Sequence, residues 1–218
     1  MTRAMISRRI LVLGGTGGTG RHIVRQALDR GHAVTAFVRS PERLKIENDR
    51  LRVLVGDVTS DGPALSDAVR DQDVVISALG VGNSLKSGGL IARSIPAIVR
   101  AMERQAVRRL IFTSAFGVGR TYQDVPFLPR VFIRTLLRDL YADKTRGEDE
   151  LFRIGNELDW TLVYPVSLTN GPATGRYRSG ERLALHGVPR ISRADVADFI
   201  LSQVDDMRYL RKGVLLGP

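Results

Sequence analysis

The sequence predicts a single α/β domain, built on a doubly wound parallel sheet with helices on both faces. Two observations support this prediction: short aliphatic runs alternate with helical patterns along the chain, and a glycine-rich turn follows the first aliphatic run. A chain of 218 residues is long enough to bury one such core and too short for a second large domain. We therefore expect one domain over residues 1–218.

The expected strands are the aliphatic runs, whose continuous apolar character is typical of parallel strands buried on both faces. They lie at residues 10–13, 33–38, 51–55, 74–79, 110–113 and 161–164. Apolar residues at helical spacing predict helices around residues 23–28, 63–69, 89–105, 131–143 and 146–155. Ser192, with Asp195 three residues later, is expected to cap a last helix that reaches Ile200.

Two segments, at about residues 117–143 and 168–190, are expected to be irregular and to lie on the substrate side of the sheet. The first begins with glycines, prolines and polar residues at 117–129, which predict a loop over the carboxyl ends of the strands. Folds of this class bind ligands there, so this loop is a candidate lid. The second segment is rich in glycine, proline and polar residues.

Charge and composition restrict the possible ligands. Lysine and arginine outnumber aspartate and glutamate by 33 to 23, and this excess favours anionic ligands such as dinucleotides, tetrapyrrole carboxylates or nucleic acid. The absence of cysteine excludes disulfides, thiolate metal sites and cysteine nucleophiles. Because His22, His32 and His186 are scattered without metal-ligand spacing, no metal is expected.

The location and partners follow from what the sequence lacks. No segment approaches the roughly 18 apolar residues of a membrane span, and residues 1–9 are not followed by the apolar run of a signal peptide. We therefore expect a cytoplasmic protein with no membrane partner and a small-molecule ligand. Arginines at 100–109 and 120–153 are mixed with acids, which is typical of a solvated surface, so nucleic acid is not favoured. The oligomeric state stays open.

The glycine-rich turn predicts dinucleotide binding. It satisfies G-x-G-x-x-G from Gly15 and the wider G-x-x-G-x-x-G from Gly14. Glycines here allow positive φ and close approach of the backbone to a pyrophosphate, which the helix N–H groups then face. The strand before the turn, and the helix and strand after it, complete the context of a Rossmann-type fold. The expected cofactor-binding residues are Gly14, Gly15, Thr16, Gly17, Gly18, Thr19 and Gly20.

The end of the second expected strand indicates which dinucleotide is bound. An acidic residue there would bind the ribose 2′-hydroxyl of NAD, but this chain has Arg39, followed by Arg43. Guanidinium groups match a 2′-phosphate in charge and geometry. NADPH is therefore the expected cofactor and NADH the less favoured one, although a surface arginine beside a helix start is the alternative explanation of Arg39.

Several segments together resemble the atypical short-chain dehydrogenase/reductases, and among them the biliverdin IXβ reductase/flavin reductase group. Besides the turn and the Val38-Arg39 strand end, they are 55–58, 72–80, 113–116, 174–177 and 190–196. The resemblance implies that Asp57 and Val58 flank the adenine, and that Leu79 and Gly80 line the ribose and pyrophosphate. Without the resemblance, we would interpret Asp57 as a turn or cap residue.

The same resemblance places the nicotinamide. It implies that Thr113 and Ser114 lie near the ring and that Pro165, Val166 and Leu168 pack beside the carboxamide. The short-chain dehydrogenase pattern Y-x-x-x-K is absent, because Lys144 follows Tyr141 by three residues. In the biliverdin/flavin reductase group a catalytic tyrosine is not expected either, so the absence of the pattern favours that branch over the epimerases and ordinary alcohol dehydrogenases.

The expected reaction is hydride transfer from NADPH to an electron-poor conjugated acceptor such as a flavin, quinone or linear tetrapyrrole. The candidate catalytic residues are Ser114, which would hydrogen-bond the developing anion while solvent supplies a proton, and Lys144, which would contact ribose or an acidic substrate edge. Ser114 as a strand-end cap and Lys144 as a surface lysine are the structural alternatives. The alternative function is a non-catalytic NADP(H) sensor, similar to the NmrA-like regulators.

Overall fold

The computed structural model describes residues 6–60, 62–82 and 84–218, and its centre is one eight-stranded sheet. The strand order is β3-β2-β1-β4-β5-β6-β10-β8, and neighbours are parallel except β10 with β8. The order reverses at β1, as in other doubly wound sheets. The strands are β1 Arg9–Leu13, β2 Ala33–Val38, β3 Leu51–Val55, β4 Val74–Ser77, β5 Arg109–Thr113, β6 Asp159–Pro165, β8 Arg178–Gly180 and β10 Lys212–Gly217.

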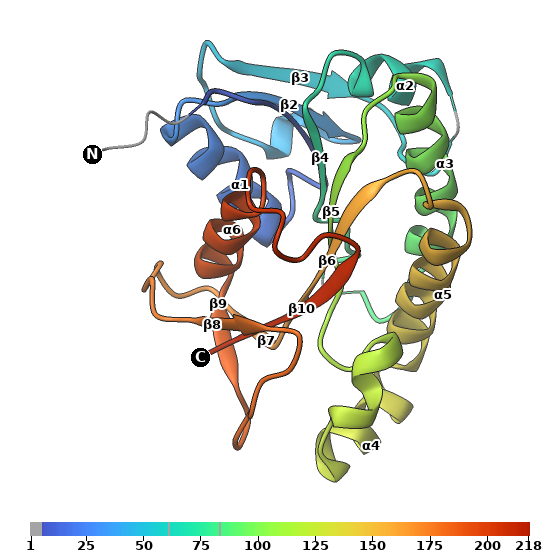
Figure 1. Ribbon diagram of the computed structural model, residues 1–218, viewed down its shortest axis with the longest axis vertical. Helices are drawn as coiled ribbons and strands as arrows, with labels where there is room; N and C mark the ends of the chain where they lie inside the picture. The colour runs from blue at the N-terminus through green and yellow to red at the C-terminus, as the bar shows by residue number, and fades with distance from the viewer. Residues whose placement is uncertain (1–5, 61, 83) are drawn as a thin grey trace.

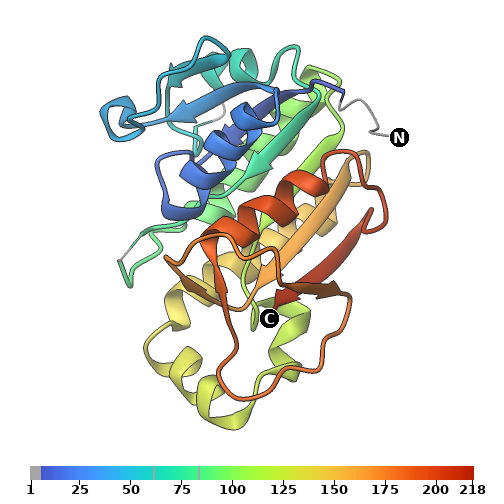
Figure 2. The ribbon, with the colours of Figure 1, turned by 90° about the vertical axis from the view of Figure 1, so that its left-hand side faces the viewer.

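Helices cover both faces of this sheet, which confirms the predicted fold class. Helices α1 (Gly18–Asp29) and α6 (Arg193–Ser202) pack together on one face (Figure 2). Helices α2 (Pro63–Val69), α3 (Leu90–Arg104) and α5 (Arg138–Ile154) cover the other (Figure 1). Within the described chain, no helix has the length and apolar character needed to cross a bilayer.

The central strands are held by burial on both sides. Ile10 and Val12 of β1 enter the core beneath α1 and α6, whereas Leu11 and Leu13 enter the core beneath α2, α3 and α5. All four side chains are fully buried. This period of two, with both faces apolar, explains why the strand has no polar alternation.

The carboxyl end of the chain adds strands that the sequence analysis did not expect. Strand β10 extends the sheet beside β6, and its Gly213 lies against the Tyr164 ring, where a Cβ atom would come within 2.5 Å of ring carbon. The segment expected to be irregular at 168–190 contains β8 and is bounded by β7 (Ser167–Thr169) and β9 (Arg190–Ser192), which pair with each other. Apart from these short strands, the 168–190 segment is irregular.

The segment at 117–143 was expected to be irregular apart from a helix at 131–143, but helical structure begins earlier in it, at residue 119. It contains a 3-10 helix, η2 (Gly119–Asp124), helix α4 (Phe127–Thr135) and the start of α5. Pro129 lies in the first turn of α4, where proline removes no helical hydrogen bond. Helix α5 continues through Gly147, so the expected break near residue 145 is absent. A glycine is present there because the helix lies in close contact with Ile91 of α3.

The predicted cap of the last helix is confirmed. Ser192 Oγ accepts a hydrogen bond from the Asp195 backbone N–H at 2.9 Å. The Asp195 carboxylate also accepts from the backbone N–H groups of Thr174 and Gly175, at 2.7 and 2.9 Å. The start of α6 therefore fixes the position of the irregular 168–190 segment.

The glycine turn gives a first prediction about stability. A Cβ atom at Gly20 would overlap the Gly14 carbonyl, so Gly20→Ala must force α1 away from β1. We expect a loss of about 1–3 kcal/mol in the free energy of unfolding, as for other overpacked sites. The matched control is Gly80→Ala, because a Cβ atom at Gly80 meets nothing within 4 Å. Urea unfolding of both variants checks the prediction, and equal stabilities would contradict it.

Candidate functional site

The glycine turn brings the start of α1 close to the ends of two strands. Gly14 has a φ of +83°, and a Cβ atom there would come within 2.6 Å of the Ala78 carbonyl oxygen that follows β4. The Gly17 backbone N–H donates to the Gly14 carbonyl at 3.0 Å, which closes the turn. Only glycine fits Gly14 and Gly20, so the sequence motif has a direct steric cause.

The start of α1 is open to solvent and suited to an anion. Gly17 is the N-cap and provides no side chain to bond the first N–H groups, and both Gly17 and Gly18 are exposed. A helix leaves its first backbone N–H groups without intrahelical partners and carries a partial positive charge at this end. The turn therefore fits a pyrophosphate, which would accept these hydrogen bonds.

Two buried hydroxyl groups mark the adjoining strand ends. Ser77 closes β4 and Thr113 closes β5, and within the described residues neither side-chain oxygen has a hydrogen-bond partner. Unpaired buried hydroxyls are uncommon, and they fit a ligand that brings its own hydrogen-bonding groups. Leu79, just beyond β4, is partly buried in the core, whereas Gly80 is exposed.

The residues expected around the adenosine lie at the ends of β2 and β3. Arg39 and Arg43 are both exposed, and their side chains make no hydrogen bond or ion pair to described residues. Asp57 accepts from the backbone and hydroxyl of Thr59, both at 2.9 Å, and these bonds lower the pKa of Asp57 more than Arg39 does. Asp57 thus stabilises the turn in which it lies, which agrees with the alternative that it is a turn or cap residue. Val58 is buried in the core.

A buried glutamate lies behind Ser114. Ser114 Oγ donates to Glu148 Oε1, and the Tyr164 hydroxyl donates to Glu148 Oε2 at 2.9 Å. Glu148 is only 1% exposed, and this burial raises the pKa of its carboxyl group. The two hydrogen bonds that the carboxylate accepts oppose this shift, because they stabilise its charged form. Ser114 is therefore hydrogen-bonded to a buried titratable group.

Lys144 lies on the same helix, one turn before Glu148. Its Nζ donates to the Thr113 carbonyl at 3.3 Å and lies 5.9 Å from the centroid of the Phe112 ring. Burial lowers the pKa of Lys144 to about 8, although the nearby Glu148 and Asp143 oppose this shift. The structure thus brings Ser114 and Lys144 to the same strand end.

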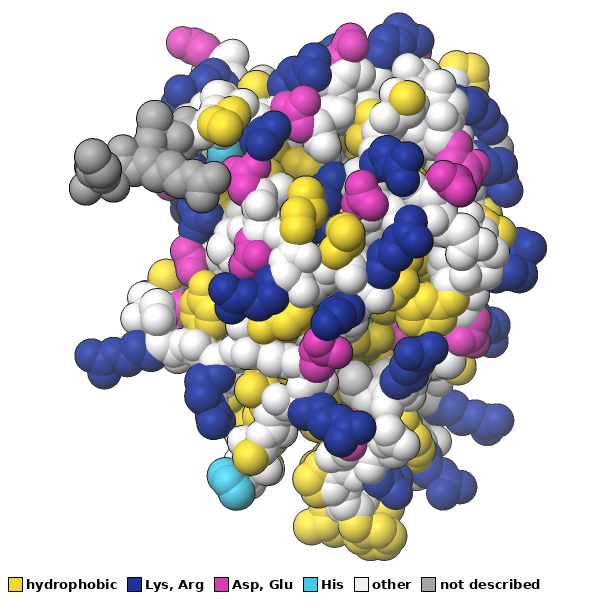
Figure 3. All heavy atoms as spheres, viewed as in Figure 1, with side chains coloured by type: hydrophobic (Ala, Val, Ile, Leu, Met, Phe, Trp, Pro, Cys, Tyr) yellow, Lys and Arg dark blue, Asp and Glu magenta, His cyan; other side chains and the backbone are white. Residues whose placement is uncertain are grey.

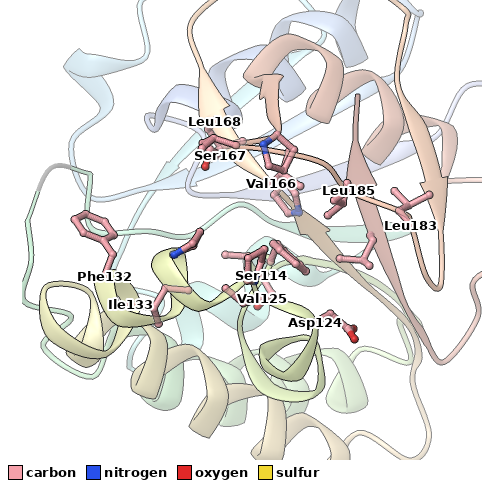
Figure 4. Close-up of a pocket in the computed structure, with 18 of the residues that line it drawn as sticks. Ser114, Asp124, Val125, Phe132, Ile133, Val166, Ser167, Leu168, Leu183 and Leu185 are labelled. Atoms are coloured by element: carbon pink, nitrogen blue, oxygen red, sulfur yellow. The ribbon is translucent and has the colours of Figure 1, made fainter.

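A cavity of about 850 Å³ opens between α4 and the 181–190 segment (Figure 4). Its floor includes Ser114, and the three residues expected beside the carboxamide, Pro165, Val166 and Leu168, line it. Its walls are largely apolar, with Phe132 and Ile133 on one side and Leu183 and Leu185 on the other (Figure 4). The residues with polar or charged side chains that line it are Ser114, Asp124, Tyr141, Ser167, Arg182 and Arg193.

The sequence analysis missed Glu148 and Arg193. Arg193 lines the cavity and lies against the turn, since a Cβ atom at Gly18 would come within 2.8 Å of its Cδ and Nε atoms. Its guanidinium also donates to Asn170 Oδ1 at 2.7 Å. Arg193 could have been found from the sequence, because it directly follows the predicted cap Ser192 and so lies at the start of a helix. Glu148 had no comparable signal.

The buried glutamate predicts a pH dependence of stability. The pKa of Glu148 is raised above 4.5, so its contribution is fully present below pH 4.5 and is lost as pH rises through its folded-state pKa. Glu148→Gln cannot ionise, so we expect the variant to gain stability relative to wild type between pH 4.5 and neutrality. Urea unfolding across this pH range measures the difference.

Glu150 of the same helix is the matched control. Arg153 donates to both of its carboxylate oxygens, and this pairing lowers the pKa of Glu150. Glu150 therefore stabilises the folded state above its ordinary pKa, and this stabilisation is lost as pH falls. The stability of Glu150→Gln relative to wild type should thus change with pH in the opposite direction. A pH-independent difference for Glu148→Gln would refute a raised pKa.

Known proteins match this chain over most of its length. A family model described as NAD(P)H-binding matches residues 14–207. Probable pinoresinol-lariciresinol reductase 3 of Arabidopsis thaliana is 33% identical over 237 residues, which cover 96% of this chain and 67% of that protein. Photosystem II assembly factor Ycf39 of Synechocystis sp. is 31% identical over 125 residues, which cover 55% of this chain and only 37% of that longer protein.

Solved structures share the fold. ChuY, an anaerobillin reductase from Escherichia coli O157:H7, has a TM-score of 0.77 and 21% identity, with 95% of this chain and 96% of that chain covered. At this identity the likeness concerns the fold alone. The family match includes the glycine turn, whose geometry fits a pyrophosphate, and the chain belongs to the NAD(P)H-binding family, with a nicotinamide dinucleotide as its cofactor class.

Proposed function

We propose that this protein is an NADPH-dependent reductase that transfers a hydride to an electron-poor conjugated acceptor, such as a flavin, a quinone or a linear tetrapyrrole. The observation that carries the proposal is the position of Ser114, which lines a large apolar cavity and is backed by a buried glutamate. The named reductases among the relatives and structural neighbours support this reaction class. The bound dinucleotide would supply the hydride.

The proposed cofactor site follows the carboxyl edge of the sheet. The turn from Gly14 to Gly20 would hold the pyrophosphate, and the free guanidinium groups of Arg39 and Arg43 would bind the 2′-phosphate. Arg193, which lies over Gly18, adds a further cation beside the phosphates. The adenine would lie near Asp57 and Val58.

The nicotinamide half would cross the ends of β4, β5 and β6. Leu79 and Gly80 would contact the ribose and pyrophosphate, and the unpaired Thr113 hydroxyl offers a hydrogen bond. Pro165, Val166 and Leu168 would then flank the carboxamide. This path leads the reactive ring to the floor of the cavity, where Ser114 lies.

The cavity fits a sizeable apolar acceptor. Its volume of about 850 Å³ lies within the range of small-molecule sites, and apolar walls with a few polar groups are typical of them. Arg182 and Arg193 would attract an acidic edge of the acceptor. Tyr141 also lines the cavity, but burial raises the pKa of its hydroxyl, which donates to the Phe116 carbonyl at 3.3 Å. Tyr141 is not assigned a catalytic role.

Ser114 and Glu148 would complete the reduction by supplying a proton. Hydride transfer leaves negative charge on the acceptor, which the Ser114 hydroxyl and the Lys144 ammonium would stabilise. A protonated Glu148 can donate to Ser114 Oγ, which releases the Ser114 proton to the acceptor anion. The hydride and this proton together give the two-electron-reduced acceptor. Solvent would then restore the proton of Glu148.

Variants of this network test the proposal. Positioned proton donors contribute about 100-fold or more to the rate, so Ser114→Ala and Glu148→Gln should lower kcat for NADPH oxidation with flavin or quinone by at least tenfold. Ser167→Ala is the control, since Ser167 is an exposed serine that lines the same cavity but takes no part in the Ser114–Glu148 hydrogen bond. Stopped-flow absorbance of NADPH measures the rates. A wild-type protein that binds NADPH yet oxidises it no faster than buffer would establish a sensor instead.

The choice of NADPH has its own test. Arg39→Asp replaces the proposed phosphate-binding guanidinium with a carboxylate, which repels a 2′-phosphate and can accept from a ribose hydroxyl. We expect Kd to rise at least tenfold more for NADPH than for NADH, as calorimetry would measure. Arg52→Asp, at an exposed position of β3 with the same change of charge, should affect both cofactors little. Equal losses for the two cofactors in Arg39→Asp would refute the preference.

A further inference from the structure

The outward face of α4 is apolar and uncovered. Phe127 and Leu128 are 75% and 77% exposed, and the apolar surface continues through Val131 and Leu136. Phe132, which also lines the cavity, is exposed at the edge of this face. Ile133, on the inward face, is buried. A helix with apolar side chains on both faces is normally covered on both. Here α4 projects at one end of the molecule, and Figure 3 shows the hydrophobic side chains gathered at that end.

The charges around this apolar face have one dominant sign. Residues 127–138 contain Arg130, Arg134 and Arg138 and no acidic residue. Arg130 is held within the chain, because it donates to the Val125 carbonyl at 2.8 Å, whereas Arg134 and Arg138 are exposed. This combination of exposed aromatic and aliphatic side chains with arginines is typical of helices that lie in the surface of an anionic membrane.

The acids near α4 do not balance these arginines. The Asp139 carboxylate is engaged in a hydrogen bond within the chain, which it accepts from the Ser87 backbone N–H at 2.6 Å. Asp124 is exposed and lines the cavity. The whole chain carries a net charge of +10, so long-range attraction to an anionic surface adds to the local effect.

The opposite side of the cavity mouth repeats the pattern. Val188, in the 181–190 segment, is 67% exposed, and Arg182 and Arg190 of that segment are exposed too. Its one acid, Glu181, is paired with Lys212 at 2.6 Å. The cavity lies between this segment and α4, and both extend toward the same end of the molecule (Figure 2).

We propose that α4 and the 181–190 segment bind the surface of an anionic lipid bilayer. The outward face of α4 would enter the boundary between headgroups and acyl chains, with Arg134 and Arg138 on lipid phosphates. This contact requires no spanning helix. It departs from the expectation of no membrane partner, and it would turn the apolar cavity toward acceptors dissolved in the membrane. The proposal rests on exposure and charge alone, so it goes beyond the proposed reductase activity.

Vesicle binding by the full chain tests the apolar contact. We expect co-sedimentation with vesicles of mixed phosphatidylcholine and phosphatidylserine to be at least tenfold stronger than with phosphatidylcholine alone. Phe127→Asp combined with Leu128→Asp should abolish it. Ile6→Asp combined with Met207→Asp, at exposed apolar positions outside α4 and the 181–190 segment, is the matched control and should bind like wild type.

A second pair of variants tests the charge contact. Each basic residue at an anionic surface contributes about fivefold in binding, so Arg134→Glu with Arg138→Glu should weaken binding by at least tenfold. Arg52→Glu with Arg208→Glu makes the same change of net charge at exposed positions away from α4 and should have a smaller effect. Equal losses in the two pairs would show nonspecific adsorption and overturn the proposal.

Other outcomes also decide the matter. Absence of wild-type binding to either vesicle would overturn the proposal, as would equal binding to both. Light scattering that shows a dimer in wild type and a monomer in the Phe127/Leu128 variant would assign the face to a second copy instead. Neither Phe127 nor Leu128 lines the cavity, so NADPH oxidation with a soluble flavin, measured without vesicles, should be unchanged in that variant. This readout separates failure of the membrane contact from failure of the reductase.

Discussion

The close approach of α1 to the ends of β1 and β4 is the constraint on which the site depends. Gly14 and Gly20 leave no room for side chains, so the helix begins directly over the crevice where the strand order reverses. At this position the free N–H groups of α1 are suited to an anion such as the pyrophosphate of a dinucleotide. The strand order then determines which residues follow, because β4, β5 and β6 place Ser77, Ser114 and Pro165 in sequence along the same edge.

The second feature of the site is electrostatic. A buried carboxyl group is costly to ionise, and Glu148 is retained between two hydroxyl donors, one of which, Ser114, lines the apolar cavity. Burial pushes the pKa values of Glu148 and Lys144 toward neutrality from opposite sides. Perturbed pKa values cluster at functional sites, so this end of the sheet is a candidate site on electrostatic grounds as well as by its cavity.

The centre of the sheet and the tight glycine-rich turn could be predicted from the sequence because both depend on local patterns. Continuous aliphatic runs such as 74–77 can be buried only between two helical layers, and the glycine spacing has a steric cause within seven residues. Strand β10 was missed because Gly213 weakens its pattern, and that glycine is explained only by the Tyr164 ring beside it.

The rest of the site depends on contacts between distant residues. Glu148 meets Ser114 and Tyr164, which are 34 and 16 positions away in the chain, so no local spacing could reveal the network. The start of α6 has a similar effect on both ligand sites: Arg193 lies on Gly18, while Asp195 holds Thr174 and Gly175. One helical turn therefore joins the glycine-rich turn to the 168–190 segment, so a displacement of the start of α6 would be transmitted to both.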